Sequence, residues 1–160
     1  MAGTGSITAQ ANGIDWTLLA EQAAEAGVFG TIECKGGRLE CAAANSAQPA
    51  TYRLEFDGPA LYVVLVMADR WQSHSIEADL LNTGDKAEEL ISEELGEVGY
   101  SECTKGDSLV PCEHFRSEDK LFTFRSKVPA EATVIAFQWL LAYEAAFRRL
   151  GDMDAGPAGE

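Results

Sequence analysis

Cysteine and histidine are the side chains of this sequence that could hold a metal ion or act together as a nucleophile and its base. The 160 residues include four cysteines and two histidines. A structural zinc site takes two of its ligands from a tight knuckle, in which they stand two to four residues apart. Here six residues separate Cys34 from Cys41, and eight separate Cys103 from Cys112. The spacing therefore favours buried structural thiols over a disulfide or a metal site, and no cofactor is expected.

Cys112 and His114 form a second arrangement with chemical potential. Two residues apart on a strand, they point to the same side, where a thiol and an imidazole could act as nucleophile and base. No oxyanion-hole motif and no third residue that would orient the imidazole can be identified in the sequence. A surface histidine beside a half-buried cysteine is therefore the favoured interpretation.

The charge of the chain limits its partners. Its 26 acidic and 12 basic residues give a formal net charge of -14, which repels a phosphate backbone or an anionic membrane surface. The longest apolar stretch, Leu61–Ala68, is far too short for a bilayer span of roughly 20 residues. The N-terminus lacks the basic start and apolar core of a signal peptide. We therefore expect a protein partner, no nucleic acid, no membrane and a cytoplasmic location.

Length and local composition predict one domain with a tail at each end. With 46% hydrophobic residues, a chain of this size can bury a core of its own. Residues 1–13 are small and polar without periodicity, and residues 151–160 are rich in Gly, Asp and Ala. The sequence predicts flexible tails over these two ranges and a single α+β domain over residues 14–150.

The domain is expected to begin with a helix and a hairpin. Asp15 can cap a helix that runs to about Ala26. Gly36-Gly37 can adopt the positive φ of a tight turn, which would set Cys34 opposite Leu39 in the hairpin.

Two later strands are predicted from their hydrophobic patterns. Residues 51–57 alternate strictly, which puts Tyr52, Leu54 and Phe56 on one buried face. Residues 61–67 are apolar on both faces, which is typical of a central strand that helices cover on one side. The cover on the other side of that strand is a first indication of a partner.

The second half of the domain predicts two helical stretches with a hairpin between them. Apolar residues recur at helical spacing over 76–95, with a break at 82–85, where Asp85 can cap a fresh helix. A long helix follows Pro129, from about residue 130 to 150. The predicted fold is α+β: an antiparallel sheet meander with helices packed on one face, in the order helix, strands, helix, hairpin, long C-terminal helix.

The predicted hairpin gathers basic side chains. A two-residue turn at Glu118-Asp119 would set Arg116 opposite Leu121, which puts Arg116 and Arg125 on one face. This basic patch could neutralise the molecule's own acidic helix or dock the carboxylates of a partner. Its residues are Arg116, Arg125, Lys120 and Lys127.

The last helix carries more apolar surface than one face can hold. At about 100° per residue, most of its apolar residues fall on a broad face that covers the sheet. Val134, Phe137 and Leu141 form a second apolar row where a surface helix should be polar. Either another part of the chain, such as the first helix, covers this row, or the row is an interface with a subunit or partner.

The order of these elements resembles the type III secretion chaperone-like fold, and in particular its YbjN-like branch. Two stretches carry the resemblance: the alternating strand Tyr52–Phe56 with the apolar strand around Leu65, and the charged hairpin from Phe115 to Pro129 that leads into a helix. The resemblance would cover residues 15–150. It implies a dimeric domain that binds protein segments and has no active site.

The sequence therefore predicts a non-catalytic protein-binding module, a chaperone-like or regulatory adaptor that acts as a homodimer. Its candidate partner-binding residues are Val134, Phe137, Leu141, Arg116 and Arg125. The alternative function is a small thiol- or metal-dependent enzyme that uses Cys112 and His114.

Overall fold

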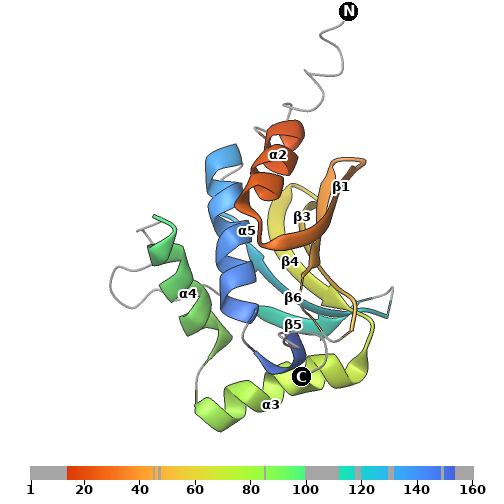
Figure 1. Cartoon of the computed structure of the whole chain (residues 1–160), viewed down its shortest axis with the longest axis vertical. Helices are drawn as coiled ribbons and strands as arrows, with labels where there is room; N and C mark the ends of the chain where they lie inside the picture. Colours follow the sequence, from red (N-terminus) through yellow and green to blue (C-terminus); the bar gives the residue numbers. More distant parts are fainter. Residues whose placement is uncertain are drawn as a thin grey trace, which may run out of the picture.

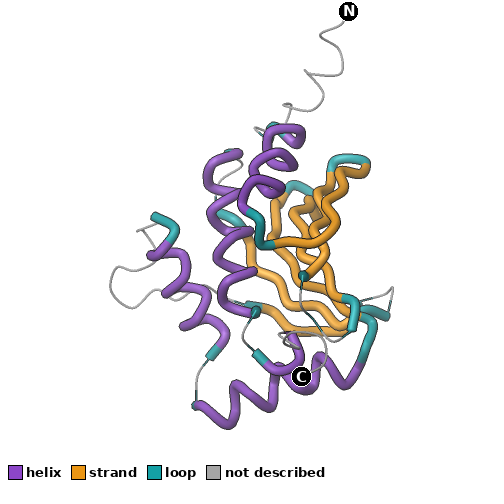
Figure 2. Tube along the Cα trace, in the orientation of Figure 1, coloured by secondary structure: helices purple, strands orange, loops and turns teal. Residues whose placement is uncertain are grey.

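Antiparallel strands form a sheet that helices cover on one face (Figure 1; Figure 2). The computed structural model describes residues 14–153 except 45, 47, 85, 100–111, 118–119, 130–131 and 149. In that part of the chain the sheet has six strands in the order β1-β2-β3-β4-β6-β5. The predicted α+β fold, with an antiparallel sheet and helices on one face, is confirmed.

The first helix, α2 (Trp16–Ala26), forms where its capping signals predict it. The Asp15 carboxylate accepts the backbone N–H of Leu18 at 3.1 Å, which satisfies one of the free donors of the first turn. Gly27 ends the helix in the left-handed conformation with φ 71°. Leu19 and Ala23 are buried and fix the helix on the sheet side of the molecule.

The first hairpin, β1 (Phe29–Lys35) with β2 (Arg38–Ala43), also follows the prediction. Gly36 and Gly37 have φ of 50° and 79°, the backbone that a tight hairpin turn requires. Cys34 pairs with Leu39 as expected.

The next two strands, β3 (Ala50–Asp57) and β4 (Ala60–Met67), build the middle of the sheet. Tyr52 and Leu54 are buried on the helix side, as their alternation predicts. β4 lies between β3 and β6, so it is the central strand that its apolar sequence indicated. On its other face, buried Val64 stands in register between Arg53 and Arg125. The expected second cover of this strand is therefore supplied by the chain's own sheet, because long arginine stems shield apolar neighbours.

Two helices follow β4, with the break between them where the sequence places it. α3 (Arg70–Thr83) ends at Gly84, which has φ 79°. It begins six residues before the predicted start at 76, because the Asp69 carboxylate caps it by accepting the N–H of Gln72 at 2.9 Å. α4 (Ala87–Glu97) begins after Lys86, and the predicted cap Asp85 lies outside the described residues.

The predicted register of the last hairpin, β5 (Glu113–Arg116) with β6 (Phe122–Lys127), is wrong by one residue. Arg116 pairs with Phe122 rather than with Leu121. The strands close where the Ser117 N–H donates to the Leu121 carbonyl at 2.8 Å, so three residues connect them instead of two. The predicted turn residues 118–119 lie outside the described part. A one-residue slip turns every side chain of β5 to the opposite face of the sheet.

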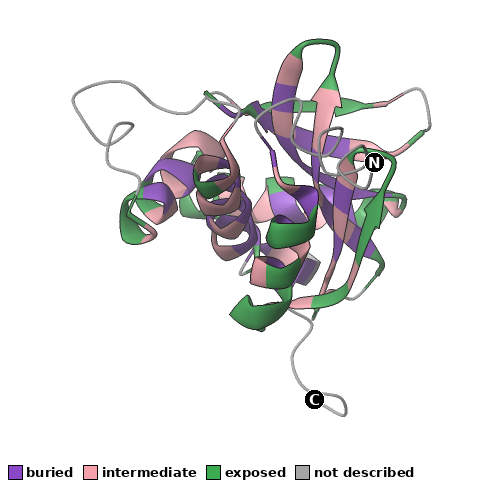
Figure 3. Cartoon of the chain, turned by 90° about the horizontal axis from the view of Figure 1, so that it is seen from above, coloured by how far each residue is buried: buried purple, intermediate pink, exposed green. Residues whose placement is uncertain are grey.

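The last helix, α5 (Thr133–Phe147), is the centre of the helical layer. It lies along the middle of the sheet with α2 on one side and α4 on the other (Figure 1). Figure 3 shows that burial concentrates along α5 and the strands beneath it. Among the described helices, none has both the length and the apolar character needed to cross a membrane.

The short 3-10 helix η2 (Gly151–Met153) extends the folded domain beyond its predicted end at residue 150. Met153 is buried against the core. The Gly151 N–H donates to the Asp79 carboxylate of α3 at 2.9 Å. Residues 151–153, which the sequence predicted in a flexible tail, are therefore part of the domain. The remaining predicted tail residues, 1–13 and 154–160, lie outside the described residues.

Gly151 gives a test of the contact between η2 and α3. A Cβ at this position would overlap Ser75 Oγ and stand 2.5 Å from the Ser75 backbone carbon, and φ is 50°. Gly27 has a similar φ of 71° but nothing within 4 Å of such a Cβ. Gly27→Ala should therefore cost about 1 kcal/mol through backbone strain alone, and Gly151→Ala about 3 kcal/mol or more through strain and overlap.

The two free energies of unfolding can be compared by urea denaturation of the full chain. Equal losses in Gly27→Ala and Gly151→Ala would mean that η2 does not pack against α3 in solution.

Candidate functional site

The two cysteines of the first hairpin lie in different surroundings. Cys41 is a buried free thiol whose pKa rises to about 12 through burial, as a structural cysteine should behave. Cys34 is free but exposed, because it stands near the hairpin turn on the edge strand β1. The expectation of a buried thiol is thus correct for Cys41 and wrong for Cys34, and Cys103 lies outside the described residues.

Metal-ligating side chains do not converge in the part of the chain that the structure describes. No group of three or more His, Cys, Asp or Glu residues stands there in a position to hold a metal ion.

Cys112 belongs to a polar cluster between β6 and α5. Its Sγ lies 3.5 Å from the Tyr143 hydroxyl of α5, which lies 2.7 Å from the Ser126 hydroxyl of β6. Burial raises the pKa of the Cys112 thiol to about 11. A nucleophilic cysteine needs a lowered pKa, so that the thiolate forms near neutral pH. The raised pKa of Cys112 is typical of a structural thiol instead.

His114 joins the last hairpin to α3. Its ring stacks on Phe124, with centroids 3.9 Å apart and planes 6° from parallel. Nε2 lies 3.2 Å from Ser73 Oγ, and Nδ1 lies 3.6 Å from the Glu77 carboxylate. Burial lowers the pKa of His114, although Glu77 acts against that shift.

In space, His114 lies between Ser73 and Glu77, as the imidazole of a serine hydrolase lies between its hydroxyl and its carboxylate. A nucleophile must be open to its substrate. Ser73 lies within α3 and is only 1% exposed. These three side chains therefore act as a tie between β5 and α3 in this conformation.

The alternative considered for Cys112 and His114, a nucleophile beside its base, is not the arrangement found; His114 is exposed and Cys112 half-buried, as the favoured interpretation expected. Cys112 turns to Tyr143 on α5, and His114 turns to Ser73 and Glu77 on α3. The two side chains thus have separate sets of polar neighbours.

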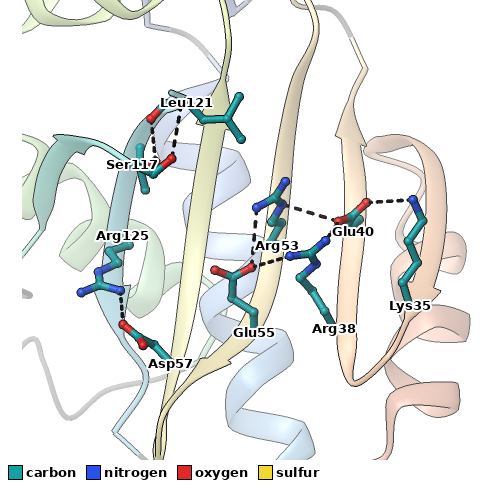
Figure 4. Close-up of polar contacts among 10 residues, drawn as sticks. Lys35, Arg38, Glu40, Arg53, Glu55, Asp57, Ser117, Leu121 and Arg125 are labelled. Atoms are coloured by element: carbon teal, nitrogen blue, oxygen red, sulfur yellow. Dashed lines mark hydrogen bonds and ion pairs between the residues drawn. The ribbon is translucent and has the colours of Figure 1, made fainter. Parts of the chain in front are cut away.

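Ion pairs cover the sheet face that points away from the helices (Figure 4). Glu40 lies at the centre, 2.7 Å from Arg38, 3.6 Å from Lys35 and 3.7 Å from Arg53. Glu55 lies 3.6 Å from Arg38 and 3.7 Å from Arg53. Charges of both signs alternate across these strands, so this face is close to neutral although the whole chain is strongly acidic.

The predicted basic patch is divided between the two faces of the sheet. Arg125 lies on the ion-paired face, 2.9 Å from Asp57 and 3.1 Å from Glu113. Arg116 is on the opposite face, over the ring of Phe122 at 5.5 Å. The shifted register separates them, and Arg125 is neutralised by its strand neighbours rather than by an acidic helix.

The second apolar row of α5 is partly covered by its own chain. α4 packs along α5, and the Gln138 side chain donates to the Val98 carbonyl at the end of α4 at 3.4 Å. Phe137 is half-buried and packs against the core, and Leu141 is half-buried. Val134 is 66% exposed. The helix that covers part of this row is α4, and only Val134 of the three predicted residues is fully open.

The outward side of α3 forms an apolar surface that the sequence analysis missed. Trp71 is 70% exposed and Leu81 is 83% exposed. His74 stands edge-on to the Trp71 ring at 6.2 Å, and the Arg70 guanidinium lies 5.8 Å above it. We call Trp71, His74, Ala78 and Leu81 the α3 stripe.

The spacing of the α3 stripe is a signal that the sequence contained. Its residues stand three, four and three positions apart, which places them on one side of a helix. The predicted helix began at residue 76, so Trp71 fell outside it. The helix start was misplaced because the sequence analysis did not identify Asp69 as its N-cap.

Comparisons of the chain with protein-family models, with curated proteins and with solved structures found no match. The resemblance to the type III secretion chaperone-like fold stays a prediction.

The cysteines test whether an activated thiol exists. Near neutral pH, iodoacetamide should modify Cys34 faster than Cys41 or Cys112 in the folded chain, because Cys34 is exposed; burial raises the pKa of all three thiols, to about 12 for Cys41 and about 11 for Cys112. Peptide mass spectrometry over a time course gives the rate at each cysteine, and the urea-unfolded chain is the control. Faster labelling of Cys112 than of Cys34 would favour the thiol enzyme.

Proposed function

We propose that this chain is a non-catalytic protein-binding module, an adaptor that binds through the α3 stripe. The observation that carries the proposal is the pair of large side chains, Trp71 and Leu81, that α3 holds in solvent. Exposed tryptophan is the residue type that most often dominates the energy of protein contacts. Arg70 and His74 hold the Trp71 ring from two sides, so little side-chain freedom is lost when a partner covers it.

The state of the polar side chains favours binding over catalysis. The raised pKa of Cys112 keeps its thiol protonated at neutral pH. Ser73, the hydroxyl nearest His114, is buried. Neither group is presented to a substrate as a nucleophile must be.

Self-association is proposed for a different surface, the open part of the α5 row around Val134. Residues 132–150 hold one carboxylate, Glu144, against Arg148 and Arg149. A second copy meets less repulsion here than on α4, which carries five glutamates and no basic residue. Exposed Val134 would stand at the centre of that contact.

The α3 stripe can be tested with peptides selected from a random library against the full chain. The selected peptides should bind Trp71→Ser and Leu81→Ser at least about tenfold more weakly than the wild type. Leu18→Ser is the matched control, because Leu18 is also exposed, at 39%, but lies on α2. All three changes are at the surface, so each variant should keep its thermal stability.

Two results would contradict this assignment. Peptides that bind the α3 variants as tightly as the wild type would place the binding surface elsewhere. A library that yields no binder would remove the support for a protein-binding module.

Sedimentation velocity over a range of concentrations tests self-association. The wild type should dimerise and Val134→Asp should sediment as a monomer, because a carboxylate at the centre of an apolar contact is desolvated without a partner. Val134 is exposed, so its substitution should not disturb the fold, whereas Phe137 packs against the core. Thr17→Asp, on the exposed side of α2, is the control. A monomeric wild type, or a dimeric Val134→Asp, would show that α5 does not mediate self-association.

A further inference from the structure

The α3 stripe lies in the most acidic part of the fold. Residues 70–97, which span α3 and α4, contain eight carboxylates against two basic side chains. The sheet face with the ion pairs is balanced by comparison, since Glu40 and Glu55 are both paired with arginine. Most of this charge is on the five glutamates of α4, and α3, which carries the stripe, adds Glu77 and Asp79 against Arg70.

Carboxylates flank the stripe on both sides. At about 100° per residue, Glu77 falls on one side of the line from Trp71 to Leu81 and Asp79 on the other. The Glu77 side chain is 49% exposed at 3.6 Å from His114. The first turn of α4 adds Glu88 and Glu89, and it follows closely after the Leu81 end of the stripe. A partner on the stripe would thus meet the exposed Glu77 carboxylate along one edge, while the half-buried Asp79 carboxylate on the other accepts the Gly151 N–H.

The shape of the stripe suits a helix. Leu81 stands ten positions after Trp71, which is about 15 Å along the helix axis. Small Ala78 lies between the larger side chains and leaves room for the ridge of a second helix to approach. Amphipathic helices commonly dock in this way, through apolar residues three and four positions apart.

A second copy of the chain is a poor occupant of this surface. Two α3–α4 segments facing each other would bring sixteen carboxylates together against four basic side chains, since each contributes eight and two. Like charges placed opposite each other across an interface are destabilising. A partner of opposite charge gains from the same surface what a second copy would lose.

We infer that the α3 stripe binds an amphipathic helix whose apolar ridge is flanked by lysine and arginine. The inference depends on the proposed protein-binding function and adds the chemistry of the partner to it. The ridge packs on Trp71 and Leu81, the basic flanks face Glu77, and the net negative charge of residues 70–97 attracts them at longer range.

Three synthetic peptides of about 16 residues, roughly 24 Å long as helices, test the inference on the full chain. They share one leucine ridge and differ only in flanks of lysine and arginine, of glutamine, or of glutamate. Trp71 fluorescence reports binding, because the other tryptophans, Trp16 and Trp139, are buried. We expect the basic peptide to bind at least about tenfold more tightly than the glutamine peptide, with an affinity that falls as salt is added.

Variants of the chain locate the contact. Trp71→Ala and Leu81→Ala, followed by calorimetry, should each weaken the basic peptide at least about tenfold. Glu77→Gln should weaken it less and reduce its salt dependence. Glu33→Gln is the matched control, since the Glu33 side chain is 52% exposed on the sheet, close to the exposure of Glu77.

The outcomes separate this inference from the proposed function. If the glutamine peptide binds as tightly as the basic one and Trp71→Ala weakens both, the stripe binds protein but the charge inference is wrong. If the basic peptide binds Trp71→Ala as tightly as the wild type, the attraction is charge alone and the inference is also wrong. If no ridge peptide binds, both fail. Self-association that Trp71→Ala abolishes would assign the stripe to a second copy and overturn the inference.

Discussion

The rest of this fold depends on the burial of α5 against the middle of the sheet. Leu140, Tyr143 and Phe147 of α5 are buried in this contact. Each such side chain stabilises the fold by on the order of 1.5–3 kcal/mol when it is removed from water. α5 in turn provides the surface on which the other helices pack. The N–H of Asp15, the cap of α2, donates to Oγ1 of Thr133, the first residue of α5, at 2.9 Å. α4 lies along the other side of α5.

Because α5 takes one face of the sheet, the opposite face must be stabilised without a helix. The chain does this with charged pairs, in which the aliphatic stems of Arg53 and Arg125 cover Val64 of β4. Arg125 combines both roles: it pairs with Asp57 and Glu113, and its guanidinium lies 4.0 Å above the Tyr62 ring. While basic side chains gather on that face, α2, α3 and α4 each keep a net negative charge. The distribution of charge on the surface thus follows from how the core is covered.

Some polar groups of the core, unlike the unpaired Tyr52 hydroxyl, have a partner from a neighbouring turn or element. Glu144 is buried on α5, where helical spacing alone suggests a surface position. It receives the Arg148 guanidinium at 2.6 Å, and burial raises the pKa of its carboxyl despite that arginine. In the same layer, Tyr143 and Ser126 share a hydrogen bond at 2.7 Å. Such buried contacts require one particular packing of α5, because an unpaired polar group would be costly there.

The sequence by itself determined the features that depend on near neighbours. Capping of α2 by Asp15, the Gly36-Gly37 turn and the alternation of β3 are all local, so their signals could be read directly. The tertiary structure alone decided the register of β5 against β6, the placing of β6 beside β4, and the burial of Glu144 and Met153. These features depend on which distant surfaces meet. A connection of three residues instead of two turns the side chains of a strand to the other face of the sheet. A helix face is buried only where a neighbouring element packs on it. For the same reason, the spacing of the α3 stripe was present in the sequence, but its exposure was known only once the core was complete.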